Sequence, residues 1–93
     1  MRSIEKDMWR VIKAKTHRRF GNMEVIYQTS TNSSWVYLHG NHIAKYMHRD
    51  GDVEVNKDTL FHWPTPTTCS RLRALGVRVN VVRGIPHIDG QPI

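Results

Sequence analysis

Two short turn signals, Gly40-Asn41 and Asp50-Gly51, stand ten residues apart in the middle of the chain. Each resembles the two-residue loops that join antiparallel strands, because positive φ angles there match the right-handed twist of the paired strands. Once both turns are placed, the residues that face each other across the strands follow by counting. The sequence therefore predicts a three-stranded antiparallel meander over about residues 34–56.

The predicted pairing assigns each large side chain of the meander to one of two faces. Directly opposed residues share a face, and alternate residues along a strand change face. The first face carries Trp35, Tyr37, Ala44, Tyr46, Val53 and Val55. The second carries Val36, Leu38, Ile43 and Met47, mixed with charged residues. Since a sheet with one solvated side alternates more cleanly, we expect cover on both faces, from this chain, a second subunit or a target.

The length of the chain, 93 residues, corresponds to a single small domain, residues 1–93. A chain of this size buries only about two-thirds of the surface that it exposes when unfolded, so its core is small. The single cysteine, Cys69, excludes an internal disulfide and fits a reducing cytoplasm. No apolar run approaches the roughly 20 residues of a membrane span. We therefore expect a cytoplasmic protein without a membrane partner.

Positive charge is concentrated near the N-terminus. The chain has 14 Lys and Arg against 8 Asp and Glu, a net charge of +6. Residues 1–20 hold seven of the basic residues and two acids, whereas residues 50–58 hold four acids and one lysine. Clustered positive charge attracts polyanions such as nucleic acid, and equally acidic protein surfaces. The alternative is a solvated helix with solubilising lysines.

An amphipathic helix is predicted at the N-terminus, with Ser3 as its N-cap and Gly21-Asn22 beyond its end. Its apolar residues recur at helical spacing and form one stripe: Ile4, Met8, Val11 and Ile12. Because a meander needs a covering layer, this stripe is expected to pack on the sheet rather than on a membrane. Residues 23–29 alternate and predict a first strand.

The C-terminal half is predicted to contain a second, short helix. The apolar run at residues 60–63 indicates a strand, and Thr65-Pro66 then supplies an N-cap and a proline at the first helical position. Gly76 ends that helix, and residues 77–82 and 85–93 indicate a strand and a closing ribbon. The expected fold is α+β: an N-terminal amphipathic helix packed on an antiparallel meander of four to six strands, with a short second helix before a C-terminal strand pair.

Histidine and cysteine residues do not complete a catalytic or metal-binding pattern. The six histidines include His39 and His42, which the predicted turn places opposite each other. Zinc needs three or four ligands, and the nearest further candidates are His48 or the distant Cys69. Cys69 lies in a predicted helix with no base at a fixed spacing. We therefore expect a protein that is not an enzyme and has no catalytic residue, metal site or cofactor.

Three segments, spread in order over nearly the whole chain, carry a resemblance to a known group of proteins. They are Met1-Arg2-Ser3-Ile4-Glu5 with Met8, Val36-Tyr37-Leu38-His39-Gly40-Asn41 followed by Ile43-Ala44, and Trp63-x-Thr65-x-Thr67-Thr68-x-Ser70-Arg71-Leu72-x-Ala74-Leu75. On these segments the chain resembles a family of small, uncharacterised proteins of tailed bacteriophages. The resemblance implies a phage origin and action in the bacterial host cytoplasm, and it supplies no activity.

Two binding hypotheses follow. In the first, the protein docks on a host protein, which fits a non-catalytic accessory inhibitor used in host takeover or counter-defence. The contacts would come from the apolar face Val36, Leu38, Ile43 and Met47. Basic residues could also meet an acidic surface of a protein that handles nucleic acid, and those residues are Arg10, Lys13, Lys15, Arg18, Arg19, Arg71 and Arg73.

In the second hypothesis the same basic residues bind phosphates of nucleic acid directly, with Trp35, Tyr37 and Tyr46 as a platform on which unpaired bases stack. The alternative for these three rings is core packing under a helix. A homodimer would be another way to cover a sheet that is apolar on both sides.

Overall fold

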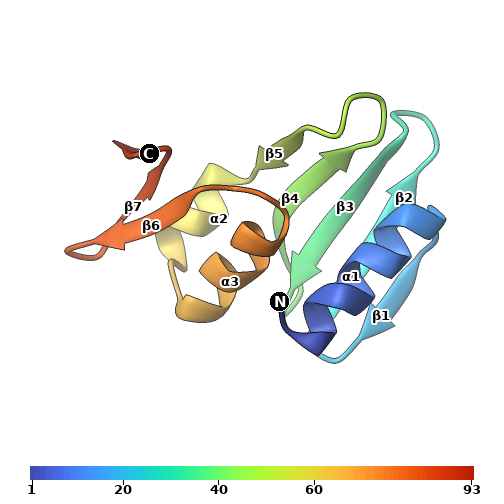
Figure 1. Cartoon of the computed structure of the whole chain (residues 1–93), viewed down its shortest axis with the longest axis horizontal. Coiled ribbons are helices and arrows are strands. Elements are labelled where there is room, and N and C mark those ends of the chain that lie inside the picture. The colour runs from blue at the N-terminus through green and yellow to red at the C-terminus, as the bar shows by residue number, and fades with distance from the viewer.

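Three helices and eight strands make up the chain in the computed structural model, which describes residues 1–93 (Figure 1). In chain order they are α1 (Ser3–Ala14), β1 (Arg18–Phe20), β2 (Met23–Gln28), β3 (Ser33–Leu38), β4 (Asn41–Met47), β5 (Val53–Val55), α2 (Lys57–His62), α3 (Pro66–Ala74), β6 (Val79–Val82), β7 (Ile85–Ile88) and β8 (Gln91–Pro92). The predicted α+β class, with an N-terminal helix and an antiparallel sheet, is confirmed.

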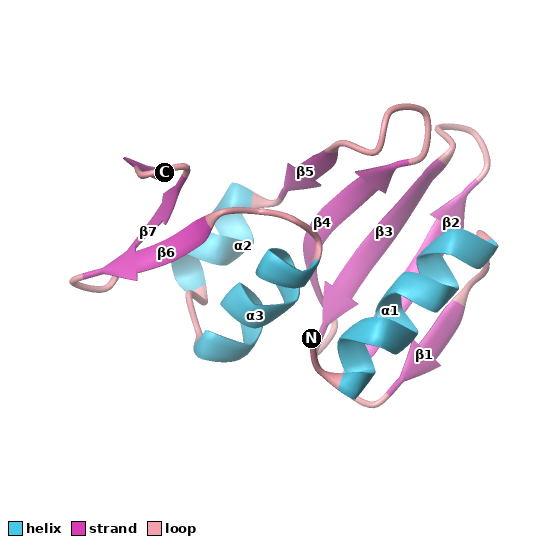
Figure 2. Ribbon diagram, in the orientation of Figure 1, coloured by secondary structure: helices cyan, strands magenta, loops and turns pink.

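The strands form two antiparallel sheets. The larger sheet has the order β1-β2-β3-β4-β5, so each strand pairs with its neighbour in sequence. The smaller sheet has the order β6-β7-β8 and extends from the side of the molecule that carries α2 and α3 (Figure 2). Helices α1 and α3 lie on the same side of the larger sheet, which leaves its opposite side without a helix (Figure 2).

Helix α1 begins and ends where its local chemistry allows. The backbone N–H of Arg2, the N-cap, donates to Oε1 of Glu5 at 3.1 Å. Lys15 follows the last helical residue and is the C-cap, with a left-handed φ of 53°. The predicted apolar stripe is confirmed, since Met8, Val11 and Ile12 are buried, while the N-cap is Arg2 rather than Ser3.

The turn between β3 and β4 differs from the predicted one by one residue. It is His39-Gly40, with φ angles of 50° and 77°, and it pairs Leu38 with Asn41. A turn with two positive φ angles favours glycine in its second position, and Gly40 holds that position only when His39 is the first. The predicted Gly40-Asn41 turn is therefore wrong.

A β-bulge beside this turn changes which side chains share a face. The register shifts between Val36 and Tyr37, so Val36 pairs with Ala44 while Tyr37 pairs with His42. The bulge inserts Ile43 as an extra residue in β4. As a result Trp35 faces Lys45 rather than Tyr46, and the predicted face that combined Trp35, Tyr37 and Tyr46 does not exist.

The connection between β4 and β5 is longer than a two-residue turn. Tyr46 pairs with Val53, and Ala44 pairs with Val55. A two-residue turn at Asp50-Gly51 instead predicts that Tyr46 pairs with Val55. A shift of two residues keeps the parity of the strand, so the predicted grouping of Ala44, Tyr46, Val53 and Val55 on one face holds despite the wrong register.

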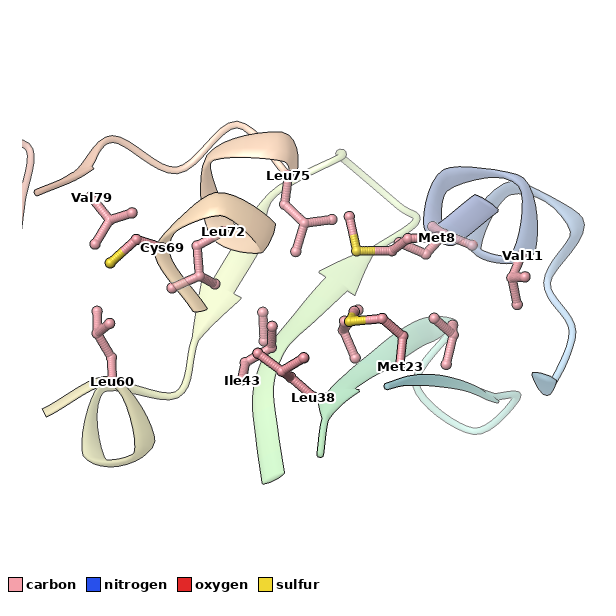
Figure 3. Close-up of a cluster of buried hydrophobic side chains, with 14 residues drawn as sticks. Met8, Val11, Met23, Leu38, Ile43, Leu60, Cys69, Leu72, Leu75 and Val79 are labelled. Atoms are coloured by element: carbon pink, nitrogen blue, oxygen red, sulfur yellow. The ribbon is translucent and has the colours of Figure 1, made fainter. Parts of the chain in front are cut away.

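The core lies between the helices and one face of the larger sheet. Figure 3 shows Met8, Leu72 and Leu75 of the helical layer above Met23, Leu38 and Ile43 of the sheet. Burying each such side chain contributes roughly 1.5–3 kcal/mol relative to leaving it exposed. The other core residues are Val11, Ile12, Val25, Val36, Ala44, Leu60, Cys69 and Val79.

Residues 57–62 form helix α2 instead of the predicted strand. Asn56 caps this helix, because its side-chain oxygen accepts a hydrogen bond from the backbone N–H of Thr59 at 3.1 Å. The predicted start of the next helix is confirmed, since the Thr65 hydroxyl accepts from the N–H of Thr68 at 3.2 Å and Pro66 is the first helical residue.

Candidate interaction surfaces

Five of the seven predicted basic residues are exposed on α1, β1 and the segment between them. This basic surface consists of Arg10, Lys13, Lys15, Arg18 and Arg19. Asp7 pairs with Arg10 at 2.6 Å, and Glu24 lies 3.8 Å from Arg19. No acidic side chain lies within 4.0 Å of the other three cations, so most of the basic surface is free to meet an anionic partner.

Arg71, also predicted to bind a partner, is buried instead. Its Nη1 donates to Oε2 of Glu5 at 2.9 Å, and the Ser70 hydroxyl donates to the same oxygen at 2.6 Å. Only 4% of either charged side chain is exposed. The prediction for Arg71 is therefore wrong, because this guanidinium joins α3 to α1 inside the molecule.

The environment of Glu5 keeps it ionised. Burial by itself raises the pKa of Glu5, but hydrogen bonds from Ser70, from the backbone of Arg2 and from Arg71 together hold it below its usual value. The pair thus brings together two buried opposite charges that would each be costly alone, although Nε of Arg71 has no hydrogen-bond partner.

Arg73 lies on α3 and binds within the protein. The residue is exposed, and its Nε donates to the carbonyl oxygen of Val79 at 3.0 Å. This bond connects the end of α3 to the first residue of β6, so Arg73 supports the position of the smaller sheet.

The predicted apolar docking face lies mostly inside the core. Val36, Leu38 and Ile43 are 0%, 4% and 2% exposed, because α1 and α3 cover their side of the sheet. These three side chains are almost entirely removed from solvent, so they do not form the predicted exposed surface. Met47 is half-buried and belongs to the opposite face, where it pairs with Ser33.

The side of the larger sheet without a helix is named here the open face. Its central row runs through Ile26, Trp35, Lys45 and Glu54, which are paired in turn across β2, β3, β4 and β5. Tyr37 lies on the same face, opposite His42. The Nζ atom of Lys45 lies 4.3 Å from the centre of the Trp35 ring, a close cation–π contact.

His42 is a packed histidine at the edge of the open face. Its ring lies 5.0 Å from the Trp35 ring and 5.3 Å from the Tyr37 ring, centre to centre. Its Nδ1 is 3.2 Å from Nδ2 of Asn56, which can donate to it only if Nδ1 is unprotonated. Burial lowers the pKa of His42, and its Nε2 is buried without a hydrogen-bond partner.

Two exposed aromatic rings gather where α2 ends. Phe61 is 56% exposed and Trp63 is 53% exposed, and the His62 ring contacts both, at 5.6 and 5.8 Å between centres. We name Phe61 and Trp63 the aromatic corner. Sequence reasoning placed both residues in a strand and missed this feature, although Asn56 and Asp58 are signals of a helix start.

A small cavity lies beside the aromatic corner. Its volume is about 240 Å³, and Trp63 lines one side of it together with Leu38 and Ile43. Polar residues line the rest: His39, Asn41, Thr59, Thr65, Thr67 and Thr68. The Trp63 ring of the aromatic corner therefore lies next to a cavity whose lining residues can donate and accept hydrogen bonds.

The side chains that could bind a metal ion or act as reactive groups do not cluster elsewhere in the molecule. His39 does not face His42 as predicted, since His39 lies in the turn and Tyr37 is the partner of His42. No three His, Cys, Asp or Glu side chains gather closely enough to hold a metal ion. Burial raises the pKa of the Cys69 thiol. None of the helices has the length and hydrophobicity needed to cross a membrane.

Comparison with known proteins identifies the chain by its sequence. No curated protein and no solved structure matches it. A family model described as Kyanoviridae Gp96 protein matches residues 1–90, and the family is one of bacteriophage proteins. This match spans the helical layer, the larger sheet and strands β6 and β7 of the smaller sheet. The chain therefore belongs to the Kyanoviridae Gp96 family of bacteriophage proteins.

Proposed function

We propose that this phage protein acts without catalysis, by binding a host protein in the bacterial cytoplasm during infection. The aromatic corner is the surface that makes the contact. Such a protein would serve host takeover or counter-defence as an inhibitor of its target. The observation that carries the proposal is the exposure of Phe61 and Trp63, each more than half accessible to solvent.

The exposure of these two rings has an energetic cost in so short a chain. Aromatic side chains bury about 150–250 Å² each and dominate the energetics of small cores and of interfaces. With only two phenylalanines and three tryptophans in the sequence, placing one of each outside the core gives up stability. Tryptophan is also enriched among the few residues that carry most of the binding energy at protein interfaces.

The basic surface supports the same proposal in a second way. Exposed cations raise the rate of association with an acidic partner more than they raise the affinity. A host protein that handles nucleic acid, or that imitates its charge, fits this property. The basic surface replaces the larger predicted set, from which Arg71 is removed by its burial and Arg73 by its hydrogen bond to Val79.

The test is capture of host proteins from a bacterial lysate with the tagged chain, after nuclease treatment to remove nucleic-acid bridges. We expect one dominant protein at a fixed stoichiometry. The double variant Phe61→Ser/Trp63→Ser should lose it, with an affinity at least about 30-fold weaker if Trp63 supplies a typical 2 kcal/mol. The matched control Val82→Ser changes an apolar residue that is 45% exposed in the smaller sheet and should retain it. Capture of nothing, or equal capture by the double variant, would contradict the proposal.

A second candidate function, direct binding of nucleic acid, rests on the three unpaired cations Lys13, Lys15 and Arg18. If the basic surface neutralises about five phosphates, the logarithm of duplex-DNA affinity falls with the logarithm of salt concentration at a slope near −4 to −5. The triple variant with glutamine at these three positions should reduce that slope by about 3. No binding to DNA or RNA at low salt would exclude this function.

A further inference from the structure

The open face is balanced in charge, although the chain as a whole has a net charge of +6. Arg19 and Glu24 lie on its β1–β2 side, 3.8 Å apart. Lys45 and Glu54 lie on its β4–β5 side, 3.9 Å apart. His17, at the edge, contacts the other oxygen of Glu24 at 2.7 Å. Each side of the face therefore carries one cation and one anion that are close together.

Apolar side chains occupy the centre of the same face. They are Ile26, Trp35, Tyr37 and Met47, all half-buried in the single chain. Flanking pairs of opposite charge around an apolar aromatic centre are the arrangement of a protein interface with a polar rim.

Nucleic acid does not fit this face well. A surface that binds single strands combines net positive charge with free ring faces on which bases can stack. The open face has no net positive charge from its arginine, lysine and glutamates. One side of the Trp35 ring is also occupied by Lys45, at 4.3 Å.

We propose that two copies of this chain pack open face against open face as a two-fold symmetric dimer. In such a dimer the same patch is used twice, so a patch that attracts itself must carry both signs of charge. A two-fold axis that runs along β3 places β1 and β2 of one copy over β4 and β5 of the other. Arg19 then comes near the second copy's Glu54, and Lys45 near its Glu24.

The area of the face comes close to the lower end of the range for specific dimers. Five strands spaced about 4.8 Å apart, with up to six or seven residues at about 3.3 Å each, span roughly 20 Å by 20 Å. The accessible area of such a face exceeds its projected area, because side chains stand above the strands. It therefore approaches the roughly 600 Å² per partner at the lower end of specific interfaces.

The test is sedimentation velocity of the full chain at low ionic strength, from about 10 μM to about 1 mM. We expect the mass to rise from 10.9 kDa towards twice that value. Tyr37→Lys should weaken the dimer by about 100-fold or more, since it places two unpaired charges at the centre of the interface. The matched control Phe61→Lys changes an aromatic ring of the aromatic corner and should dimerise normally.

A second variant keeps the test valid if Tyr37→Lys is poorly folded. The Glu54 side chain is 67% exposed, so Glu54→Arg should leave the fold intact and weaken the dimer by removing its attraction to Arg19. A monomer at 1 mM, or a normal dimer of both variants, would overturn the proposal. So would a monomeric chain that loses a captured host protein on Tyr37→Lys, because the face would then belong to the host protein. Since the control alters the aromatic corner, failure of the dimer and failure of host binding are distinguishable.

Discussion

The two faces of the five-stranded sheet are built from the same strands and differ in almost every other respect. On β3, Val36 and Leu38 are sealed under α1 and α3, while Trp35 and Tyr37 between and beside them are only half-buried. The covered face holds the core, and the open face holds aromatic rings with paired charges. A single inserted residue at the bulge near Ile43 decides which residues of β4 join each face. The comparison shows that the apolar side chains of the covered face are taken up by the core, so an exposed docking surface has to come from other residues.

The largest expected effect comes from placing a charge on the covered face. Leu38→Asp should unfold the protein or nearly so, because an unpaired buried carboxylate costs much of the about 5–15 kcal/mol that stabilises a small domain. The matched variant Tyr37→Asp, one residue away on the open face, should fold with a cooperative transition in urea. Equal loss of structure in both variants would contradict the assignment of the two faces.

The next effect concerns the ion pair that holds the covering layer together. Arg71→Ala should lower the free energy of unfolding by about 3–5 kcal/mol, since it leaves Glu5 buried without its partner. The exposed arginine in the same helix gives the control, as Arg73→Ala should cost about 1 kcal/mol for one lost hydrogen bond. Similar urea midpoints for the two variants would show that Arg71 is not buried.

The dependence of stability on pH tests the contribution of Glu5 to the same ion pair. The pKa of Glu5 is lowered in the folded protein, so the pair contributes its full stability above the usual value of 4.5. This contribution is lost as the pH falls below that value and through the folded pKa. The free energy of unfolding should decrease on acidification, and Glu5→Gln should show a smaller decrease. An unchanged pH dependence in that variant would assign acid instability to other carboxylates.

The smallest effect is expected on the open face itself. Tyr37→Ala should change the free energy of unfolding by about 1 kcal/mol or less in dilute solution, because a half-buried ring loses little contact. Leu38→Ala, in contrast, should cost about 2–5 kcal/mol. A measured cost for Tyr37→Ala that equals the cost for Leu38→Ala would indicate a cover on the open face in the monomer.

Local signals in the sequence predicted the elements that depend on local chemistry. The stripe of α1 and the Thr65-Pro66 start of α3 follow from helical spacing and capping, and both are present. The predicted register of β3 and β4 was wrong because Gly40 can be the first or the second residue of a two-residue turn. Only the turn with His39 first and Gly40 second has both positive φ angles, as in type I′. Nothing local in the sequence marks the bulge, which accompanies the burial of Ile43 in the core.

Helical spacing indicates that Glu5 and Arg71 are buried, although charged residues are usually exposed. Arg71 is three residues after Thr68 and four before Leu75, and Glu5 is three before Met8, so both charges lie on the buried side of their helices. The aromatic corner was missed because apolar residues are usually expected to be buried. The apolar run at residues 60–63 predicts a strand, whereas Asn56 caps a helix that leaves Phe61 and Trp63 exposed.

The most direct test of the two-faced sheet is the reaction of engineered thiols with a small thiol reagent at about 5 μM protein, where the proposed dimer is dissociated. Single variants Val36→Cys and Tyr37→Cys are compared, with buried Cys69 as a slow internal reference in each. We expect Tyr37→Cys to react rapidly and Val36→Cys to react as slowly as Cys69. Rapid reaction at Val36→Cys with protection at Tyr37→Cys would contradict the assignment of the covered and open faces.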